Sequence, residues 1–436
     1  MDFERQFDRI AQRALQSAAA PSLSIAATYD GRVAYCKAFG DAAPHTVYGI
    51  ASITKQFTAA CILLLVRAGK LSLDDPVAKW FPRVTAADRI RVHHLLTHTS
   101  GLPDYYPLGF ADEEKLHAIA PEAVVEKYGT QRLQFEPGSA WSYSNTGFHL
   151  LGLIVERVTG DRFGDFLTQA VLVPSGMTHS FFNDPPRDAR AVVQGYTRYC
   201  LGPLREAPSE RAGWTYASGG IASSAEDLAR WHVGLMNAEL LRAGELAIMT
   251  QHAALPAGPS LPALGWFCEQ RGKFRVIQHS GGVAGFASQV IVAPGSRCSV
   301  VVLANGDHVQ TGAIASELFE HLLPGAKPPP PNAPTHPHDA ENAARNWIDM
   351  LVSGTAPPDR LTPEFHAFLS DIRRGDASAG VRAAGDLLDV AAVAAGERGG
   401  MDWFRVRCEF AQLRADAVFR QTGDGRLAEF MLYPIP

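Results

Sequence analysis

A proline-rich segment near residue 330 divides this sequence into two parts of unequal length. The segment begins at Pro324 and reads PGAKPPPPNAP. Because proline has no amide hydrogen and a fixed φ angle, such a run favours an extended, semi-rigid linker over a helix or a strand. We therefore expect a linker at 324–338, between a large unit at 1–323 and a small domain at 339–436.

The composition excludes several classes of protein. Hydrophobic residues make up 46% and charged residues 19% of the chain, which is typical of a globular protein. The formal net charge is -5, and no run of Lys or Arg is dense enough to bind a phosphate backbone, so we expect no nucleic-acid partner. The most apolar helical stretch, 59–66, is far shorter than the roughly 20 residues needed to cross a bilayer, so we expect no transmembrane span.

The N-terminal residues predict a compartment. They read MDFERQFDRIAQRAL, an amphipathic helical pattern without the apolar core of an export signal. A cytoplasmic protein is therefore expected, or a periplasmic or secreted one if a signal was removed before this numbering began. The six cysteines are scattered without a C-x-x-C motif, which favours buried thiols over a disulfide framework.

The large unit shows strand patterns at both ends. Residues 22–28 and 33–38 flank an Asp-Gly turn and predict an antiparallel hairpin. Three further strands are expected at 274–278, 287–292 and 299–304. We therefore predict an antiparallel sheet that combines both ends of this unit.

Helices are expected between these strands and in the small domain. The predicted helices are 54–68, 150–159, 225–237 and 341–353. In the small domain, strict alternation of apolar and charged residues at 404–410 predicts a half-buried strand, and a second strand is expected at 427–433. The fold class is thus α/β (α+β): an antiparallel sheet flanked by helices, with a mostly helical subdomain and a small C-terminal α+β domain.

Ser52 and Lys55 form the first candidate site. They lie three positions apart, so on a helix the hydroxyl and the amine share one face. A nearby base can activate a serine hydroxyl as a nucleophile, and a helix N-terminus favours the anion that develops. Alone, the pattern is weak evidence, because an N-cap serine with a solvent-exposed lysine is the more common explanation.

Two further segments carry suitable chemistry. Tyr143 and Asn145 lie in a loop bounded by Gly and Pro, which presents a phenol and an amide in fixed positions. The residues His279, Ser280, Gly281 and Gly282 follow a predicted strand, where missing side chains let a substrate backbone lie along the sheet edge.

Together, these segments resemble the S-x-x-K, Y-x-N and K/H-[ST]-G motifs of the serine β-lactamase and penicillin-binding protein superfamily. The resemblance is to its class C branch, which includes D-alanyl-D-alanine carboxypeptidases, D-aminopeptidases and esterases. It covers about 300 residues, with further matching segments at 95–103, 174–177, 218–227 and 302–305. It implies a β-lactamase-like fold.

The resemblance also implies a role for each residue. Ser52 would be the acylated nucleophile, Lys55 its partner in proton transfer, and Tyr143 a base or proton shuttle. Which of Lys55 and Tyr143 takes the first proton stays open. Asn145 would hold the substrate amide, and the backbone amides of Ser52 and Gly282 would form the oxyanion hole.

His279 departs from the pattern of class C β-lactamases, which have lysine there. The change removes a permanent positive charge, so recognition of a substrate carboxylate becomes weaker or dependent on pH. Together with Ser280, Gly281 and Gly282, His279 is expected to bind substrate, and its identity favours a peptidase or an esterase over a β-lactamase.

We thus expect a serine hydrolase that acts through an acyl-enzyme on Ser52, most simply on small amides or peptides of the D-amino-acid type or on esters. A β-lactamase, an acyltransferase using the same site, and a penicillin-binding sensor without turnover remain alternatives. No metal or organic cofactor is required. The oligomeric state is open.

Other residues allow two interpretations each. His93, His94 and His98 cluster without a carboxylate or cysteine at ligand spacing, so capping and loop-fixing roles are favoured over a metal site. Large aromatics either line a cleft or pack in a core, and this applies to Tyr105, Tyr106 and Trp141. The small domain is either an inert cap or a module at the cleft edge that narrows substrate access.

Overall fold

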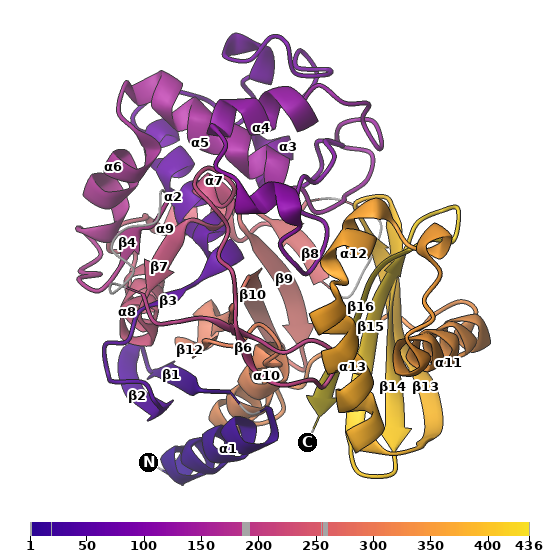
Figure 1. The fold of residues 1–436 in the computed structure, drawn as a ribbon. Coiled ribbons are helices and arrows are strands. Elements are labelled where there is room, and N and C mark those ends of the chain that lie inside the picture. The colour runs from indigo at the N-terminus through magenta and orange to yellow at the C-terminus, as the bar shows by residue number, and fades with distance from the viewer. Residues whose placement is uncertain (1, 19, 185–191, 254, 256–259, 436) are drawn as a thin grey trace.

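The computed structural model describes residues 2–18, 20–184, 192–253, 255 and 260–435. Its centre is an antiparallel sheet that combines both ends of the large unit (Figure 1). In spatial order the strands are β2 (Arg32–Gly40), β1 (Ser22–Tyr29), β12 (Cys298–Ala304), β11 (Phe286–Ala293), β10 (Phe274–Val283), β9 (Trp266–Arg271) and β8 (Ser260–Ala263). The predicted hairpin and the three predicted strands are therefore confirmed, and β8 and β9 extend the sheet beyond the prediction.

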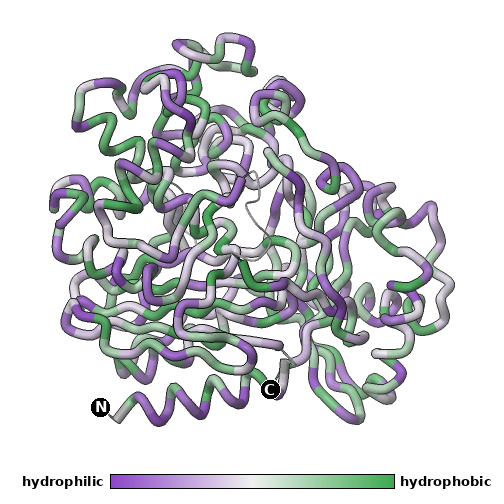
Figure 2. Tube along the Cα trace, turned by 60° about the vertical axis from the view of Figure 1, so that its left-hand side comes forward, coloured by the Kyte–Doolittle hydropathy of each residue, from purple (hydrophilic) through white to green (hydrophobic). Residues whose placement is uncertain are grey.

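Helices cover both faces of this sheet. The side chains of β12 alternate, with Val300 and Val302 facing α1 (Asp2–Ala18) and α10 (Thr311–Leu322). Val301 and Leu303 face the opposite side, where α8 (Ala225–Met236) packs. Hydrophilic and hydrophobic residues alternate along α1 in Figure 2, because only one side of this helix contacts the sheet.

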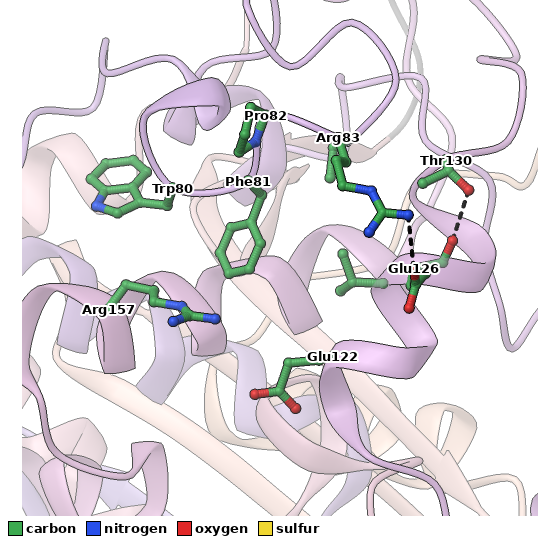
Figure 3. Close-up of a pocket in the computed structure, with 10 residues that line it drawn as sticks. Trp80, Phe81, Pro82, Arg83, Glu122, Glu126, Thr130 and Arg157 are labelled. Carbon is green, nitrogen blue, oxygen red and sulfur yellow. Dashed lines mark hydrogen bonds and ion pairs between the residues drawn. The ribbon is translucent and has the colours of Figure 1, made fainter.

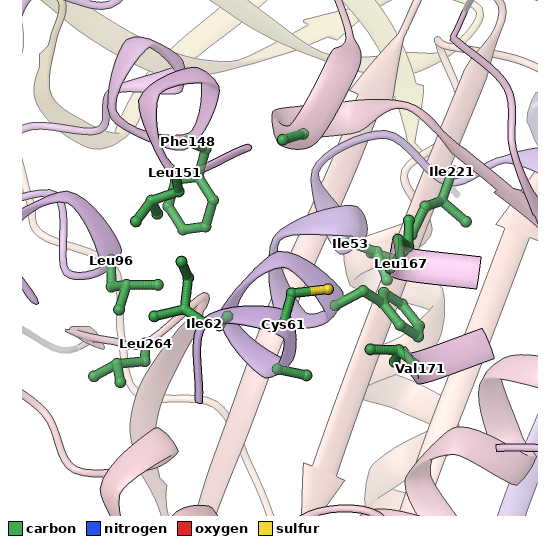
Figure 4. Packing of buried hydrophobic residues seen from close by; sticks show 14 of the residues in the cluster. Ile53, Cys61, Ile62, Leu96, Phe148, Leu151, Leu167, Val171, Ile221 and Leu264 are labelled. Carbon is green, nitrogen blue, oxygen red and sulfur yellow. The ribbon is translucent and has the colours of Figure 1, made fainter. Parts of the chain in front are cut away.

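A mostly helical subdomain lies above the sheet in Figure 1. Its helices and those beside it are α2 (Thr54–Arg67), α3 (Val92–Leu96), α4 (Pro121–Tyr128), α5 (Asn145–Thr159), α6 (Phe163–Leu167), α7 (Tyr216–Gly219) and α9 (Ala243–Met249). Figure 4 shows α2 surrounded by apolar side chains, with Ile62 facing α3 and α5 and Cys61 on another side. This burial of most of α2 fixes the position of the helix and of the residues that precede it.

Short strands connect this subdomain to the sheet. A three-stranded sheet contains β3 (Tyr48–Gly49), β7 (Ile221–Ser223) and β4 (Phe181–Phe182). The pair β5 (Tyr196–Thr197) and β6 (Arg205–Glu206) forms a separate ribbon. Among the described residues, no helix combines the length and the apolar character that crossing a membrane requires.

The C-terminal part has its own sheet. Residues 323–336 connect α10 to α11 (Pro337–Ser353), which is followed by α12 (Pro363–Phe368) and α13 (Asp371–Ala384). The strands β13 (Leu387–Arg398), β14 (Met401–Phe410), β15 (Arg414–Gln421) and β16 (Leu427–Ile435) form an antiparallel sheet in that order. The expected α+β character is confirmed, although α12, α13, β13 and β15 were not anticipated.

The core of this C-terminal part does not end at its own sheet. Phe110 of the large unit stacks on Phe368, with ring centroids 4.0 Å apart. Cys200 and Leu201 belong to the same buried cluster as Phe419 and Phe430. Apolar packing therefore fixes the C-terminal sheet against the large unit, on the right in Figure 1. Of the six cysteines, five are buried as expected and Cys36 is exposed.

Candidate active site

Ser52 lies in a short 3₁₀ turn, Ala51–Ile53, directly before α2. Ala51 has a φ of 49°, in the left-handed region that non-glycine residues rarely occupy. The buried helix α2 holds this turn, so Ser52 keeps a fixed position at the helix N-terminus while its side chain stays half-buried. Strained backbone of this kind is common next to functional residues.

Lys55 is completely buried one turn further along. Its Nζ lies 3.0 Å from Ser52 Oγ, 2.7 Å from Asn145 Oδ1 and 2.7 Å from the carbonyl oxygen of Ser218. Burial holds the pKa of Lys55 well below its usual value, although Asp104 acts in the opposite direction. The structure thus brings the amine and the hydroxyl together, and it favours the neutral amine.

Tyr143 completes this cluster. The Lys55 Nζ lies 4.9 Å from the centroid of the Tyr143 ring, and the imidazole of His98 stacks on that ring at 4.3 Å. Burial raises the pKa of the phenol, while the positive charge of Arg398 and a hydrogen bond with Ser52 lower it. The alcohol, the amine and the phenol from two distant segments are therefore in mutual contact.

Asn145 is held by Asp104. The Asp104 Oδ1 accepts hydrogen bonds from the Asn145 backbone N at 3.0 Å and from its Nδ2 at 2.9 Å. This fixes the amide orientation, so that Asn145 Oδ1 faces Lys55. Asn145 therefore orients Lys55 as well as facing the cleft.

The end of β10 borders the same space. Strand β9 pairs with β10 only as far as Gln278, so residues 279–283 pair with β11 and leave their other edge open. A Cβ on Gly281 would lie 2.3 Å from the carbonyl oxygen of Ile50, so only glycine fits there. At Gly282 the corresponding space is empty, which leaves room for a substrate.

His279 is buried and neutral. Burial lowers its pKa to about 3, and the nearby Lys55 acts in the same direction. Its Nδ1 lies 2.6 Å from the Ser280 carbonyl oxygen, and among the described residues its Nε2 has no hydrogen-bond partner. The absence of lysine was expected to make recognition of a substrate carboxylate either dependent on pH or weaker. Because His279 does not titrate near neutral pH, the structure supports the weaker attraction of a carboxylate.

These residues line a cleft of about 660 Å³. Tyr105, Tyr106 and Trp141 also line it, which decides their interpretation in favour of the cleft, although Tyr105 is itself buried. The C-terminal part contributes a wall as well, with Glu397, Arg398, Trp403, Val418, Arg420 and Tyr433. This part of the chain thus forms one border of the cleft.

The predicted loop-fixing role of the histidines is seen in their hydrogen bonds with the backbone. His94 Nδ1 accepts a hydrogen bond from the Arg91 backbone N, and His98 Nδ1 accepts one from the Ser144 backbone N. His98 thereby fixes the loop that carries Tyr143. In the ranges that the structure describes, no three His, Cys, Asp or Glu side chains are grouped so that they could hold a metal ion.

Sequence reasoning missed three contributions to this site. Asp104 directly follows the segment 95–103, and only the hydrogen bond that its carboxylate accepts from Asn145 in the structure shows that it belongs to the site. The carbonyl oxygen of Ser218 reaches Lys55 from a segment matched by resemblance alone. Arg398 lies more than 340 positions after Ser52, and the only local signal was the Gly399-Gly400 turn that follows it.

Comparison with known proteins identifies the family. A model of the Beta-lactamase family matches residues 7–320. Protein flp of Staphylococcus aureus (strain N315) is 29% identical over 339 residues, which are 74% of this chain and 66% of that protein, so the chain spans just under two thirds of this relative.

Two solved structures extend the likeness to three dimensions. A D-stereospecific amidohydrolase from Streptomyces sp. has a TM-score of 0.65 at 25% identity and covers 73% of this chain and 98% of its own. The octameric penicillin-binding protein homologue from Pyrococcus abyssi has a TM-score of 0.67 at 21% identity and covers 99% of this chain and 100% of its own, so it shares the fold, including the C-terminal sheet. The chain belongs to the beta-lactamase family, in the superfamily of serine β-lactamases and penicillin-binding proteins.

Proposed function

We propose that this protein is a serine hydrolase that forms an acyl-enzyme on Ser52 and hydrolyses small amides of the D-amino-acid type or esters. The observation that carries this proposal is the contact between Ser52 and a buried lysine whose pKa is held low. A neutral amine beside a hydroxyl is a competent base, which an exposed lysine is not at neutral pH.

The hydrogen bonds of Lys55 support its role as the first base. The Asn145 Oδ1 and the Ser218 carbonyl oxygen only accept hydrogen bonds, so they occupy two amine hydrogens. A neutral amine then has a lone pair for the hydrogen of Ser52 at 3.0 Å. Tyr143 is the weaker candidate, because burial opposes formation of the tyrosinate.

The reaction then follows two steps. The Ser52 oxygen attacks the substrate carbonyl carbon while its proton passes to Lys55, and the backbone amides of Ser52 and Gly282 stabilise the oxyanion. The amine or alcohol leaves with a proton relayed from Lys55 through Tyr143, and an ester remains on Ser52. Water attacks this ester with the same groups as base, and Ser52 regains its proton.

Three features of the cleft favour a small substrate. Its volume of about 660 Å³ lies within the range of small-molecule sites. The open edge of residues 279–283 can pair with an extended amide, and one hydrogen of Asn145 Nδ2 remains for its carbonyl oxygen. The D-stereospecific amidohydrolase supports amides of D-amino acids as the first class to test.

A substrate panel tests the proposal. D-amino-acid amides, D-Ala-D-Ala peptides, p-nitrophenyl esters and nitrocefin are assayed together, with intact-mass analysis after treatment with a fluorophosphonate. We expect turnover of an amide or ester and one adduct, on Ser52. An unmodified protein, or an adduct at another residue, would overturn the proposal.

The same panel separates the alternatives. Hydrolysis of nitrocefin above that of the amides would identify a β-lactamase. Transfer of the acyl group to added alcohols or amines would identify an acyltransferase, and a burst of acylation without turnover would identify a sensor.

A further inference from the structure

The turn between β13 and β14 places the C-terminal sheet against the cleft. Gly399 and Gly400 have φ angles of 64° and 79°, which forms a tight turn directly after Arg398. A Cβ on Gly399 would lie 2.7 Å from Pro107, so the tip of this hairpin is seated on the loop that contains Asp104. The close fit fixes where the Arg398 side chain starts.

Arg398 then reaches two elements of the large unit. Its Nη2 donates to the Tyr106 carbonyl oxygen at 2.8 Å and to Asp104 Oδ2 at 3.2 Å. Its guanidinium carbon lies 4.9 Å from the centroid of the Tyr143 ring. The Arg398 side chain is 29% exposed and the Asp104 side chain is fully enclosed, so water reaches the cation of this pair but not the carboxylate.

Asp104 connects Arg398 to the amine. One carboxylate oxygen faces Arg398, and the other holds Asn145, whose Oδ1 accepts a hydrogen bond from Lys55. A continuous path of polar contacts therefore runs from the C-terminal hairpin to the base beside Ser52. Without Arg398, the enclosed carboxylate would lose its cationic partner, and the cost of a buried, unpaired charge would favour rearrangement of this path.

The charge of Arg398 also acts on the two groups that exchange protons. It lowers the pKa of Tyr143 and that of Lys55, in the latter case adding to the effect of burial. The ionisable groups around this pair come from several elements and are Asp104, His98, His149, His279, Arg398 and Arg420. Burial holds the pKa of each of these histidines low, and the cations near Asp104 are Arg398 on β13 and Arg420 on β15.

We infer that Arg398 is a positioning residue of the reaction: it holds Asp104, and through it Asn145 and Lys55, so the active site is completed by the C-terminal domain of the same chain. The inference rests on the proposed function of Ser52. This inference gives the C-terminal domain a role in the reaction besides bordering the cleft. It also assigns a purpose to the Arg398 cation beside Tyr143, where the neighbouring β10 residue, His279, is neutral.

The test measures how fast a fluorophosphonate modifies Ser52 between pH 5 and 9, which needs no knowledge of the substrate. In Arg398→Gln we expect the rate to fall about tenfold or more, as for the loss of a hydrogen bond to a charged group. The midpoint of the acidic limb should move to higher pH, because Lys55 no longer feels the positive charge. Arg398→Lys should retain the wild-type midpoint while its rate stays below wild type, because the shorter lysine side chain places its amine nearer the backbone than Nη2 and lacks the guanidinium that faces the Tyr143 ring.

Arg407→Gln is the matched control. Arg407 lies on β14 of the same sheet and pairs with Asp416 at 3.1 Å, away from the cleft. This variant should keep the wild-type rate and midpoint. Thermal unfolding of all three variants separates loss of folded protein from loss of reactivity.

The possible outcomes separate failure of the inference about Arg398 from failure of the proposed function. A wild-type rate and midpoint in folded Arg398→Gln would overturn the inference while leaving the proposed function intact. If Arg398→Gln does not fold, a wild-type rate in Arg398→Lys would overturn it instead. Absence of labelling at Ser52 in the wild-type protein would overturn the proposed function, and the inference with it.

Discussion

The cleft at Ser52 and a groove on the helical subdomain are both concave, but they differ in the state of their charged groups. In the cleft, Lys55 is fully buried and Asp104 nearly so, and both are tied to neighbouring polar groups. The groove has a volume of about 250 Å³ and presents Trp80, Phe81 and Pro82 (Figure 3). Its ion pair between Arg83 and Glu126 is largely exposed.

The difference shows what makes a hollow reactive. An exposed pair such as Arg83 and Glu126 stays in contact with water, so the attraction between its charges is weak. A buried amine loses its hydration, so its pKa falls and its neutral form, which can accept a proton, is favoured. The comparison therefore predicts large effects of substitution in the cleft and small effects in the groove.

Ser52→Ala should give the largest effect. We expect turnover of the best substrate to fall roughly a thousandfold or more, because the covalent step requires the hydroxyl. Steady-state kinetics with an amide or ester measures this, and an unchanged melting temperature serves as the control. Activity at the wild-type level would place the reaction elsewhere.

Asp104→Asn should have an intermediate effect. The substituted amide can accept hydrogen bonds from Asn145, but one of its ends is a donor and cannot pair with Arg398. Loss of the charged hydrogen bonds should reduce kcat about 10- to 100-fold. If kcat stays within twofold of wild type, the path from Arg398 to Lys55 does not support the reaction.

His279→Gln should leave the pH profile unchanged between pH 5 and 8. The pKa of His279 is about 3, so this residue is neutral throughout that window and adds no limb to the profile of kcat/KM. Disappearance of a limb near pH 6 in the variant would show that His279 titrates in the cleft.

His279 should also affect stability in acid. In the unfolded chain a histidine binds its proton at about pH 6.5, whereas in the fold it does so near pH 3, so its neutral form is favoured by folding. The contribution of neutral His279 to the free energy of unfolding is therefore fully present above pH 6.5 and is lost as the pH falls towards 3. The melting temperature of His279→Gln should therefore decrease less than that of the wild-type protein between pH 7 and 4.

Arg83→Ala in the groove should have the smallest effect. Both members of its ion pair are exposed, and such pairs contribute little to stability. We expect kcat/KM within twofold of wild type and a melting temperature within about one degree. A several-fold decrease in activity would show that the groove communicates with the cleft, and would end the contrast between the two hollows.

Much of the fold was predictable because its signals are local. The Asp30-Gly31 turn takes the positive φ angles, 51° and 69°, that join β1 to β2. The β-branched run at 299–304 predicted a strand, which the structure confirms as β12 and buries on both faces. By contrast, β13 reads LLDVAAVAAGER, whose alanines do not show the alternation of a half-buried strand, so only pairing with β14 identifies it.

The candidate site divides in the same way. The spacing of Ser52 and Lys55 placed both groups on one face, because a helical turn brings residues three apart together. The low pKa of Lys55 was not predictable, because burial depends on what packs around α2.

The sequence by itself determined which groups can react: a hydroxyl, an amine, a phenol and a glycine-containing strand end, in an order and spacing typical of one superfamily. Only the tertiary structure decided their surroundings, because desolvation and charge act through space and not along the chain. It buried Lys55 and His279 and so lowered the pKa of both, and it brought Arg398 to Asp104 across 294 positions of sequence.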